Sequence, residues 1–196
     1  VDSIHAMLEG KAKIFIALGG NFAAATPDTE RSYQALQQCE LTVQISTKLN
    51  RSHVITGKRA LILPCLGRTE IDRQLSGEQC ITVEDSMSMV HSSTGQNEPA
   101  SDQLRSETDI VAGMAMASVG NNIVNWHKLA SDYALIRQEI SIVIPDFEDY
   151  NARIKNGRGF YLDNPASKRQ WRTPMKKATF CDAKLPEQLA HERAQL

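Results

Sequence analysis

The stretch "KIFIALGGNFAAATPDTERS", residues 13–32, decides the fold of this chain. Ile14–Leu18 form a continuous apolar run without polar alternation, which predicts a strand buried on both faces of a parallel sheet. Gly19 and Gly20 end the run, and glycine and asparagine tolerate positive φ, so a sharp turn with accessible backbone N–H groups is expected. Thr26 as N-cap and Pro27 at the first helical position then predict a helix. A strand, a glycine turn and a helix are the opening of a Rossmann-type unit.

This turn matches neither common phosphate-binding pattern. The glycines do not follow the GxGxxG spacing, and no Lys-Ser or Lys-Thr pair follows them as in a P-loop. Asp28 and Glu30 place negative charge in the predicted first turn, which disfavours a phosphate bound directly at the helix N-terminus. The stretch by itself therefore leaves two interpretations open, a tight turn between strand and helix or a cradle for a ligand.

The composition is that of an ordinary globular protein. The 196 residues are 41% hydrophobic and 23% charged, with a formal net charge of -1, so no basic field favours nucleic acid or an anionic membrane. No apolar stretch approaches the roughly 20 residues of a membrane span, and the first residues lack the features of a signal peptide. The four cysteines, Cys39, Cys65, Cys80 and Cys181, form no CxxC motif. We expect a cytoplasmic protein with reduced thiols that binds neither nucleic acid nor membranes, and no metal site in this segment.

Further elements follow along the chain. Strands are predicted at residues 41–46, 60–63, 80–83 and 178–181, and the residues after Met87 are expected to be irregular. Helices are predicted after the cap Ser106, from about Asn125 to Ile140, and at residues 147–155. Short strands that alternate with helices indicate an α/β layered sheet. The absence of an initial Met and the polar end suggest a piece of a larger protein.

Five blocks of the sequence, in this order, resemble one family: "FIALGGN", "LPCLGRTEIDRQ", "VEDSMSMVHSSTG", "LRSETDIVAGMA" and "RTPMKKATF". The family is that of the molybdopterin-dependent oxidoreductases, in its formate-dehydrogenase-like alpha-subunit branch. The resemblance implies a fragment from the C-terminal part of a catalytic subunit that holds molybdenum by two molybdopterin guanine dinucleotides. Residues 1–156 would be part of a Rossmann-like three-layer domain with a short parallel sheet. Residues 157–196 would be a linker and the first strand of a β-barrel domain, where Lys176 replaces the family's usual glycine.

The resemblance also implies which residues contact the guanosine diphosphate end of one dinucleotide. In the family, the loop after the first strand lies against this group. The second strand often ends in an acid, where this chain has Ile45 and Ser46. The implied cofactor-binding residues are Gly19, Gly20, Asn21, Ser46, Thr47, Lys48, Asn50, Arg51, Ser52, Arg68, Glu70 and Glu107.

Several of these positions have simpler interpretations, which stay open. Ser46 and Thr47 could form an ordinary turn at a strand end, and the residues from Lys48 onward a solvated loop. Arg68, Glu70, Asp72 and Arg73 could form a surface ion-pair group. Glu107 could only complement the helix dipole after Ser106.

No catalytic residue is assigned, because the resemblance implies that the molybdenum ligand and any iron–sulfur motif lie upstream of this segment. A small-molecule substrate and the remaining domains of the same chain would be the partners, and the isolated segment is expected to be inactive. Two other hypotheses remain: a stand-alone Rossmann module for NAD or a similar nucleotide, and a non-catalytic interaction domain. The missing GxGxxG and the missing acid after the second strand argue against the NAD module.

Overall fold

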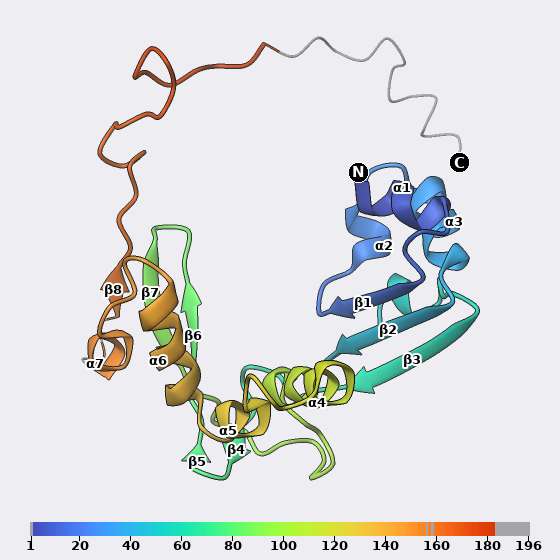
Figure 1. Cartoon of the computed structure of the whole chain (residues 1–196), viewed down its shortest axis with the longest axis horizontal. Coiled ribbons are helices and arrows are strands. Elements are labelled where there is room, and N and C mark those ends of the chain that lie inside the picture. Colours follow the sequence, from blue (N-terminus) through green and yellow to red (C-terminus); the bar gives the residue numbers. More distant parts are fainter. Residues whose placement is uncertain (1, 156, 158, 183–196) are drawn as a thin grey trace.

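A computed structural model describes residues 2–155, 157 and 159–182 of the chain, and its first half is built around a small parallel sheet (Figure 1). The strands β1 (Ile14–Leu18), β2 (Leu41–Ser46) and β3 (Arg59–Pro64) lie in the order β1-β2-β3. Both pairs are parallel, with Ile16 beside Val43 and Val43 beside Leu61. The three strands therefore end at the same edge of the sheet.

Helices cover both faces of this sheet, which confirms the α/β class. On one face, α1 (Asp2–Leu8), α2 (Phe22–Ala25) and α3 (Thr29–Gln38) enclose a core of Met7, Ala23, Ala35, Leu36 and Cys39, against which Phe15 of β1 packs. On the opposite face, Ile110 and Met114 of α4 (Glu107–Val119) pack against Val43 and Ile45 of β2. Side chains of a strand alternate between its faces, so these two cores lie on opposite sides of the sheet.

Two expectations for the opening stretch are wrong. β1 is not buried on both faces, since Ile14, Ile16 and Leu18 are 58%, 52% and 50% exposed. Their side chains share the face of α4, but α4 covers β2 rather than β1. The predicted helix also does not start at Thr26, which is the C-cap of the short helix α2. The longer helix α3 begins at Thr29 after the N-cap Asp28, whose carboxylate accepts the N–H of Arg31.

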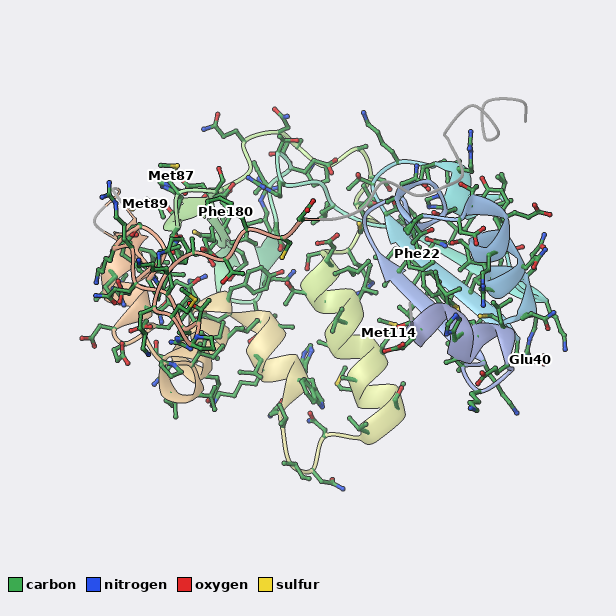
Figure 2. The ribbon with its side chains drawn as sticks, turned by 90° about the horizontal axis from the view of Figure 1, so that it is seen from above. Phe22, Glu40, Met87, Met89, Met114 and Phe180 are labelled. Atoms are coloured by element: carbon green, nitrogen blue, oxygen red, sulfur yellow. The ribbon has the colours of Figure 1, made fainter. Side chains whose placement is uncertain are left out.

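The other half of the molecule is a separate antiparallel sheet with its own core, formed by residues from 81 to 93 and from 133 to 161. The strands β6 (Ile81–Glu84), β7 (Met89–Ser93) and β8 (Phe160–Tyr161) lie in the order β6-β7-β8. Beside them lie α6 (Tyr133–Val143) and α7 (Tyr150–Lys155), and Figure 2 shows Met89 of β7 far from Phe22 at the parallel sheet. Val90, Tyr150, Ile154 and Phe160 form the buried cluster of this half.

Short elements connect the two halves. They are the two-stranded ribbon of β4 (Arg73–Gln74) and β5 (Gly77–Glu78) and the helix α5 (Trp126–Ser131), whereas the 3-10 turn η1 (Arg51–His53) lies within the parallel-sheet half between β2 and β3. The helix expected between Asn125 and Ile140 is interrupted at Asp132, which caps α6 by accepting the N–H of Ala134. No helix in the described part of the chain is both long enough and apolar enough to cross a membrane.

Two strand predictions fail for related reasons. β7 forms where irregular chain was expected, because pairing with β6 and β8 outweighs the weak local signal of Met89–Ser93. Ala178–Cys181, expected to be the first barrel strand, is irregular, since no described segment lies beside it as a pairing partner. The pairing of β8 with β7 ties Phe160 and Tyr161 to the residues before them, and the proposed division at residue 156 stays a prediction. Residues 183–196 of the expected barrel segment lie outside the described residues.

Candidate functional site

The candidate site lies at the carboxyl edge of the parallel sheet, where ligands bind in open α/β sheets. β1, β2 and β3 run there into Gly19, Thr47 and Cys65. A Cβ atom placed on Gly67 would lie 3.8 Å from Cγ2 of Thr47, and one on Gly19 would lie 3.9 Å from Oε1 of Glu107. Gly67 therefore lies beside Thr47, and Gly19 beside the first residue of α4.

The Gly19–Gly20 turn has the conformation expected from its sequence. The φ angles of Gly19 and Gly20 are +65° and +70°, a region that residues with a side chain adopt with strain. The N–H of Gly19 donates to the carbonyl of Ile45 at 2.8 Å and fixes the turn to β2. Nothing lies within 4 Å of a Cβ placed on Gly20. The backbone at Gly20 is therefore open to the close approach of another group.

The loop after β2 clamps this turn from behind. The amide of Asn50 donates to the carbonyl of Gly20 at 2.8 Å, and the hydroxyl of Ser52 donates to Oδ1 of Asn21 at 3.2 Å. The same Ser52 oxygen accepts the N–H of Ala23 at 3.0 Å. Ser52 is 1% exposed, so it acts on the turn from inside the protein rather than from the solvent side. Asn50 and Ser52 were predicted as cofactor contacts; the structure shows them holding the turn, and direct contact stays a prediction.

His53 was expected in the polar loop that could reach a diphosphate but was not among the predicted cofactor-binding residues, and the structure places it in this clamp. Its Nδ1 accepts the N–H of Asn50 at 3.0 Å, so the neutral ring carries its proton on Nε2. His53 is 7% exposed, and Nε2 is a buried polar atom that no described group satisfies. A buried donor without an acceptor is costly, and its burial makes His53 part of the interior support of the turn rather than of its open side. The reciprocal capping of η1 by Asn50 and His53 was the available signal, and it is weak in the sequence.

The remaining residues of the polar loop lie toward the solvent. The hydroxyl of Ser46 donates to the carbonyl of Lys48 at 2.8 Å, which is the strand-end turn of the simpler interpretation. Lys48 and Arg51 are exposed, and Nη1 of Arg51 lies 3.4 Å from the hydroxyl oxygen of Tyr33. Two cationic side chains thus stand on the solvent side of the clamp, where an anionic ligand could reach them.

Glu70 has a structural role in the loop after β3. Its Oε2 accepts the N–H of Gly67 at 2.6 Å and its Oε1 accepts the N–H of Ala100 at 3.0 Å. These two backbone hydrogen bonds, that of Gly67 first, hold the pKa of the Glu70 carboxyl below its usual range. A contact of Glu70 or Arg68 with a pterin stays a prediction.

The alternative interpretation of this loop, a mutual ion-pair group, is wrong within the described residues. Arg73 pairs instead with Glu98 at 2.9 Å and with Glu78 at 3.5 Å. Asp72 accepts hydrogen bonds from the hydroxyl of Tyr133 and from the side-chain amide of Gln74.

A buried polar network fixes the start of α4 beside the site. Ser106, the predicted cap, accepts the N–H of Asp109 at 3.1 Å, and its hydroxyl lies 2.7 Å from that of Tyr133. Tyr133 donates to Asp72, so Ser106 is the donor toward Tyr133. Burial, and next the hydrogen bond to Asp72, raise the pKa of Tyr133 to about 12. The network therefore contains a neutral tyrosine at any ordinary pH.

Glu107, the first residue of α4, stands between the turn and a small cavity. The cavity holds about 70 Å³ and is lined by residues of the loop after β3 and of the α4 start, among them Gly67, Arg68, Glu70, Ser106 and Glu107. Glu107 lies in the first turn of the helix, as the simpler interpretation predicted, and its Oε1 also approaches Gly19. The two interpretations of Glu107 are thus compatible. In the described part of the chain, no group of three or more His, Cys, Asp or Glu side chains could hold a metal ion.

Comparison with known proteins gives relatives that are much longer than this chain. It is 48% identical to Protein YdeP of Escherichia coli over 184 residues, which are 94% of this chain and 24% of that protein. Protein YdeP of Shigella flexneri is 49% identical over the same shares. "Uncharacterized oxidoreductase Rv2900c" of Mycobacterium tuberculosis is 48% identical over 182 residues, which are 92% of this chain and 23% of that protein.

The chain thus spans about a quarter of the length of the curated relatives it matches. No family model matches it.

Proposed function

We propose that this chain is the cofactor-binding portion of a molybdenum oxidoreductase that is formate-dehydrogenase-like. In this proposal it holds the guanosine diphosphate end of one molybdopterin guanine dinucleotide. Oxidoreductase activity is supported by the printed name of the mycobacterial relative at 48% identity. The finer assignment is supported by the five sequence blocks and by the single observation that carries it: an open Gly19–Gly20 turn at the carboxyl edge of a parallel sheet.

The residues at this edge suit a nucleotide diphosphate. The glycine backbone can approach phosphate oxygens closely, and Lys48 and Arg51 stand nearby as charge-assisted donors. When bound, the molybdenum cofactor supplies two-electron redox chemistry at the metal. The residues of this chain bind and orient one end of it.

Glu107 suits a different part of the same group. Its carboxylate would repel a phosphate, but it accepts hydrogen bonds, and the edge of guanine carries N–H donors. A carboxylate beside Gly19 therefore favours guanine over a base that presents acceptors there. The role that the family often gives to an acid after the second strand would pass in this chain to Glu107.

Analysis of the protein expressed from its complete gene tests the proposal. The purified protein should contain molybdenum together with two GMP per metal, released by acid hydrolysis. Retention of NAD without molybdenum would support the stand-alone nucleotide module instead. Absence of both molybdenum and nucleotide, with the metal available in the growth medium, would support the interaction domain and contradict the proposal.

A further inference from the structure

One face of β1 is apolar and open. Ile14, Ile16 and Leu18 project from it, each at least half exposed, and Leu61 of β3, which shares this face, is 46% exposed. No charged side chain lies on β1 itself. Parallel strands with continuous apolar runs are buried on both faces in proteins, because helices cover each side of the sheet. This strand thus has the composition of a buried strand but is covered by helices on one face only.

The helix that should complete this layer covers only part of it. Ile110 and Met114 of α4 pack over β2. β1 is the edge strand that lies farthest from α4 (Figure 1). Figure 2 shows Met114 on the side of α4 toward the sheet. α4 is also apolar around its circumference, with Val111 and Val119 exposed on its other sides. A helix that is apolar all round is typically buried all round. The outer layer of the sheet therefore has room for a further element beside α4.

We propose that the open face of β1 is an interface within a longer polypeptide, covered by an apolar helix from outside these 196 residues. The relatives supply the reason for this occupant: at 48% identity they are about four times as long, so about three-quarters of their chain lies beyond the matched region. Among the described strands β1 pairs with β2 alone, so its outer edge is open to a further parallel strand. A strand and its crossover helix would close both the edge and the face.

This inference does not depend on the cofactor. It concerns packing at Ile14, Ile16 and Leu18, while the proposed function concerns the turn that follows them. An apoprotein of full length should bury the face as well as a loaded one. A failure of one proposal therefore leaves the other intact.

Thiol labelling in the protein from the complete gene tests the interface. Ile16→Cys and, as a reactivity control, Leu75→Cys are made in a Cys181→Ser background, and maleimide adducts are quantified site by site by mass spectrometry. Leu75 is 82% exposed in the β4–β5 turn. We expect Cys at position 16 to react at least about 20-fold more slowly in the native protein than in urea, with protection independent of protein concentration.

Three results would overturn the proposal. The first is a native labelling rate at position 16 close to that in urea, and the second is protection that disappears as a dimer dissociates on dilution. The third is a complete gene that encodes no chain beyond these residues. If the Cys variant does not fold, hydroxyl-radical oxidation of the unmodified protein gives the same measurement at Ile16 and Leu18.

Discussion

The two sheets of this chain differ in how much of their apolar surface they bury themselves. In the antiparallel half, Phe147, Tyr150 and Phe160 enclose one another, with ring centroids 5.0 to 5.9 Å apart. The guanidinium carbon of Arg153 lies 3.7 Å from the centroid of the Phe160 ring and closes the cluster from outside. In the parallel half, Ile14, Ile16 and Leu18 of β1, on the face of the sheet where α4 packs, are at least half exposed.

This difference separates a supporting region from a region built to meet other groups. The antiparallel half packs Phe147, Tyr150 and Phe160 into its own core. The parallel half presents an open glycine turn at one edge of the sheet and an open apolar face beside it. Mutations should therefore destabilise the two halves very unequally, and the following predictions test that contrast.

The largest effect should come from truncating the aromatic cluster. Phe160→Ala removes a ring that is 8% exposed and touches two other aromatic rings, and we expect the free energy of unfolding to fall by about 3–5 kcal/mol. Ile16→Ala, on the open face of β1, should cost less than about 1 kcal/mol in the 196-residue chain. Urea unfolding of both variants measures the difference. Equal losses would contradict the contrast between the halves.

The next effect is a loss of stability at high pH through Tyr133, which joins the two halves. Its pKa is raised to about 12, above the ordinary value of 10, so the folded state retains a proton that the unfolded state loses between these two pH values. The stabilisation is complete below pH 10 and falls as the pH rises toward 12, by about 3 kcal/mol in all. Unfolding free energies measured across this range give the slope. A Tyr133→Phe variant with the same slope would show that another group is responsible.

A smaller effect is expected from Ser52, which clamps the glycine turn. Ser52→Ala removes the acceptor for the N–H of Ala23 and the donor to Asn21, and should cost about 1–2 kcal/mol. Ser131→Ala is the matched control, because the hydroxyl of this half-buried serine donates to the carbonyl of Lys128 within its own helix. Hydrogen exchange at Gly20 and Asn21 should speed up in the first variant alone. Unchanged exchange in both variants would show that Ser52 does not stabilise the glycine turn.

The smallest effect should appear in acid, at Glu70. Its lowered pKa means that the two hydrogen bonds from Gly67 and Ala100 stabilise the loop above the ordinary pKa and are lost as the pH falls through the lowered value. Glu70→Gln should reduce stability at neutral pH by about 1 kcal/mol or less and flatten the acid dependence. Acid titrations of the two proteins, followed by the exchange of the Ala100 amide, show the difference. Identical titrations would show that a group other than Glu70 causes the loss of stability in acid.

The local signals near the glycine turn were strong enough to predict much of the fold. The bounds of β1, the strand β2, the third strand and the Ser106 cap follow from apolar runs and capping residues, and the structure has them. The helix start predicted at Thr26 is wrong, because Thr26 is the C-cap of α2 and not the N-cap of α3. β7 depends in part on its pairing with the distant β8, and the N–H of Tyr133, next to the break at Asp132, donates to Oε1 of the distant Gln79.

The candidate site was predictable in position but not in detail. Parallel strands bring Gly19, Thr47 and Gly67 to one edge, which the order of elements already implied. The clamp formed by Asn50, Ser52 and His53 depends on contacts across about thirty residues, such as that between Asn50 and Gly20, so no local pattern showed it. Glu70 could equally have faced a ligand or its own loop, and only the structure shows its two backbone partners.

The central claim is that the backbone at Gly20 approaches a bound nucleotide, and a comparison of two glycines with nearly equal φ angles tests it most directly. Gly10 and Gly20 have φ angles of +69° and +70°, and nothing lies within 4 Å of a Cβ placed on either. Replacement by Ala should therefore strain both backbones alike, by about 1 kcal/mol. In the protein from the complete gene, we predict that Gly20→Ala lowers the GMP and molybdenum content about tenfold or more while Gly10→Ala retains the unmutated content. Equal cofactor content in the two variants would contradict the account.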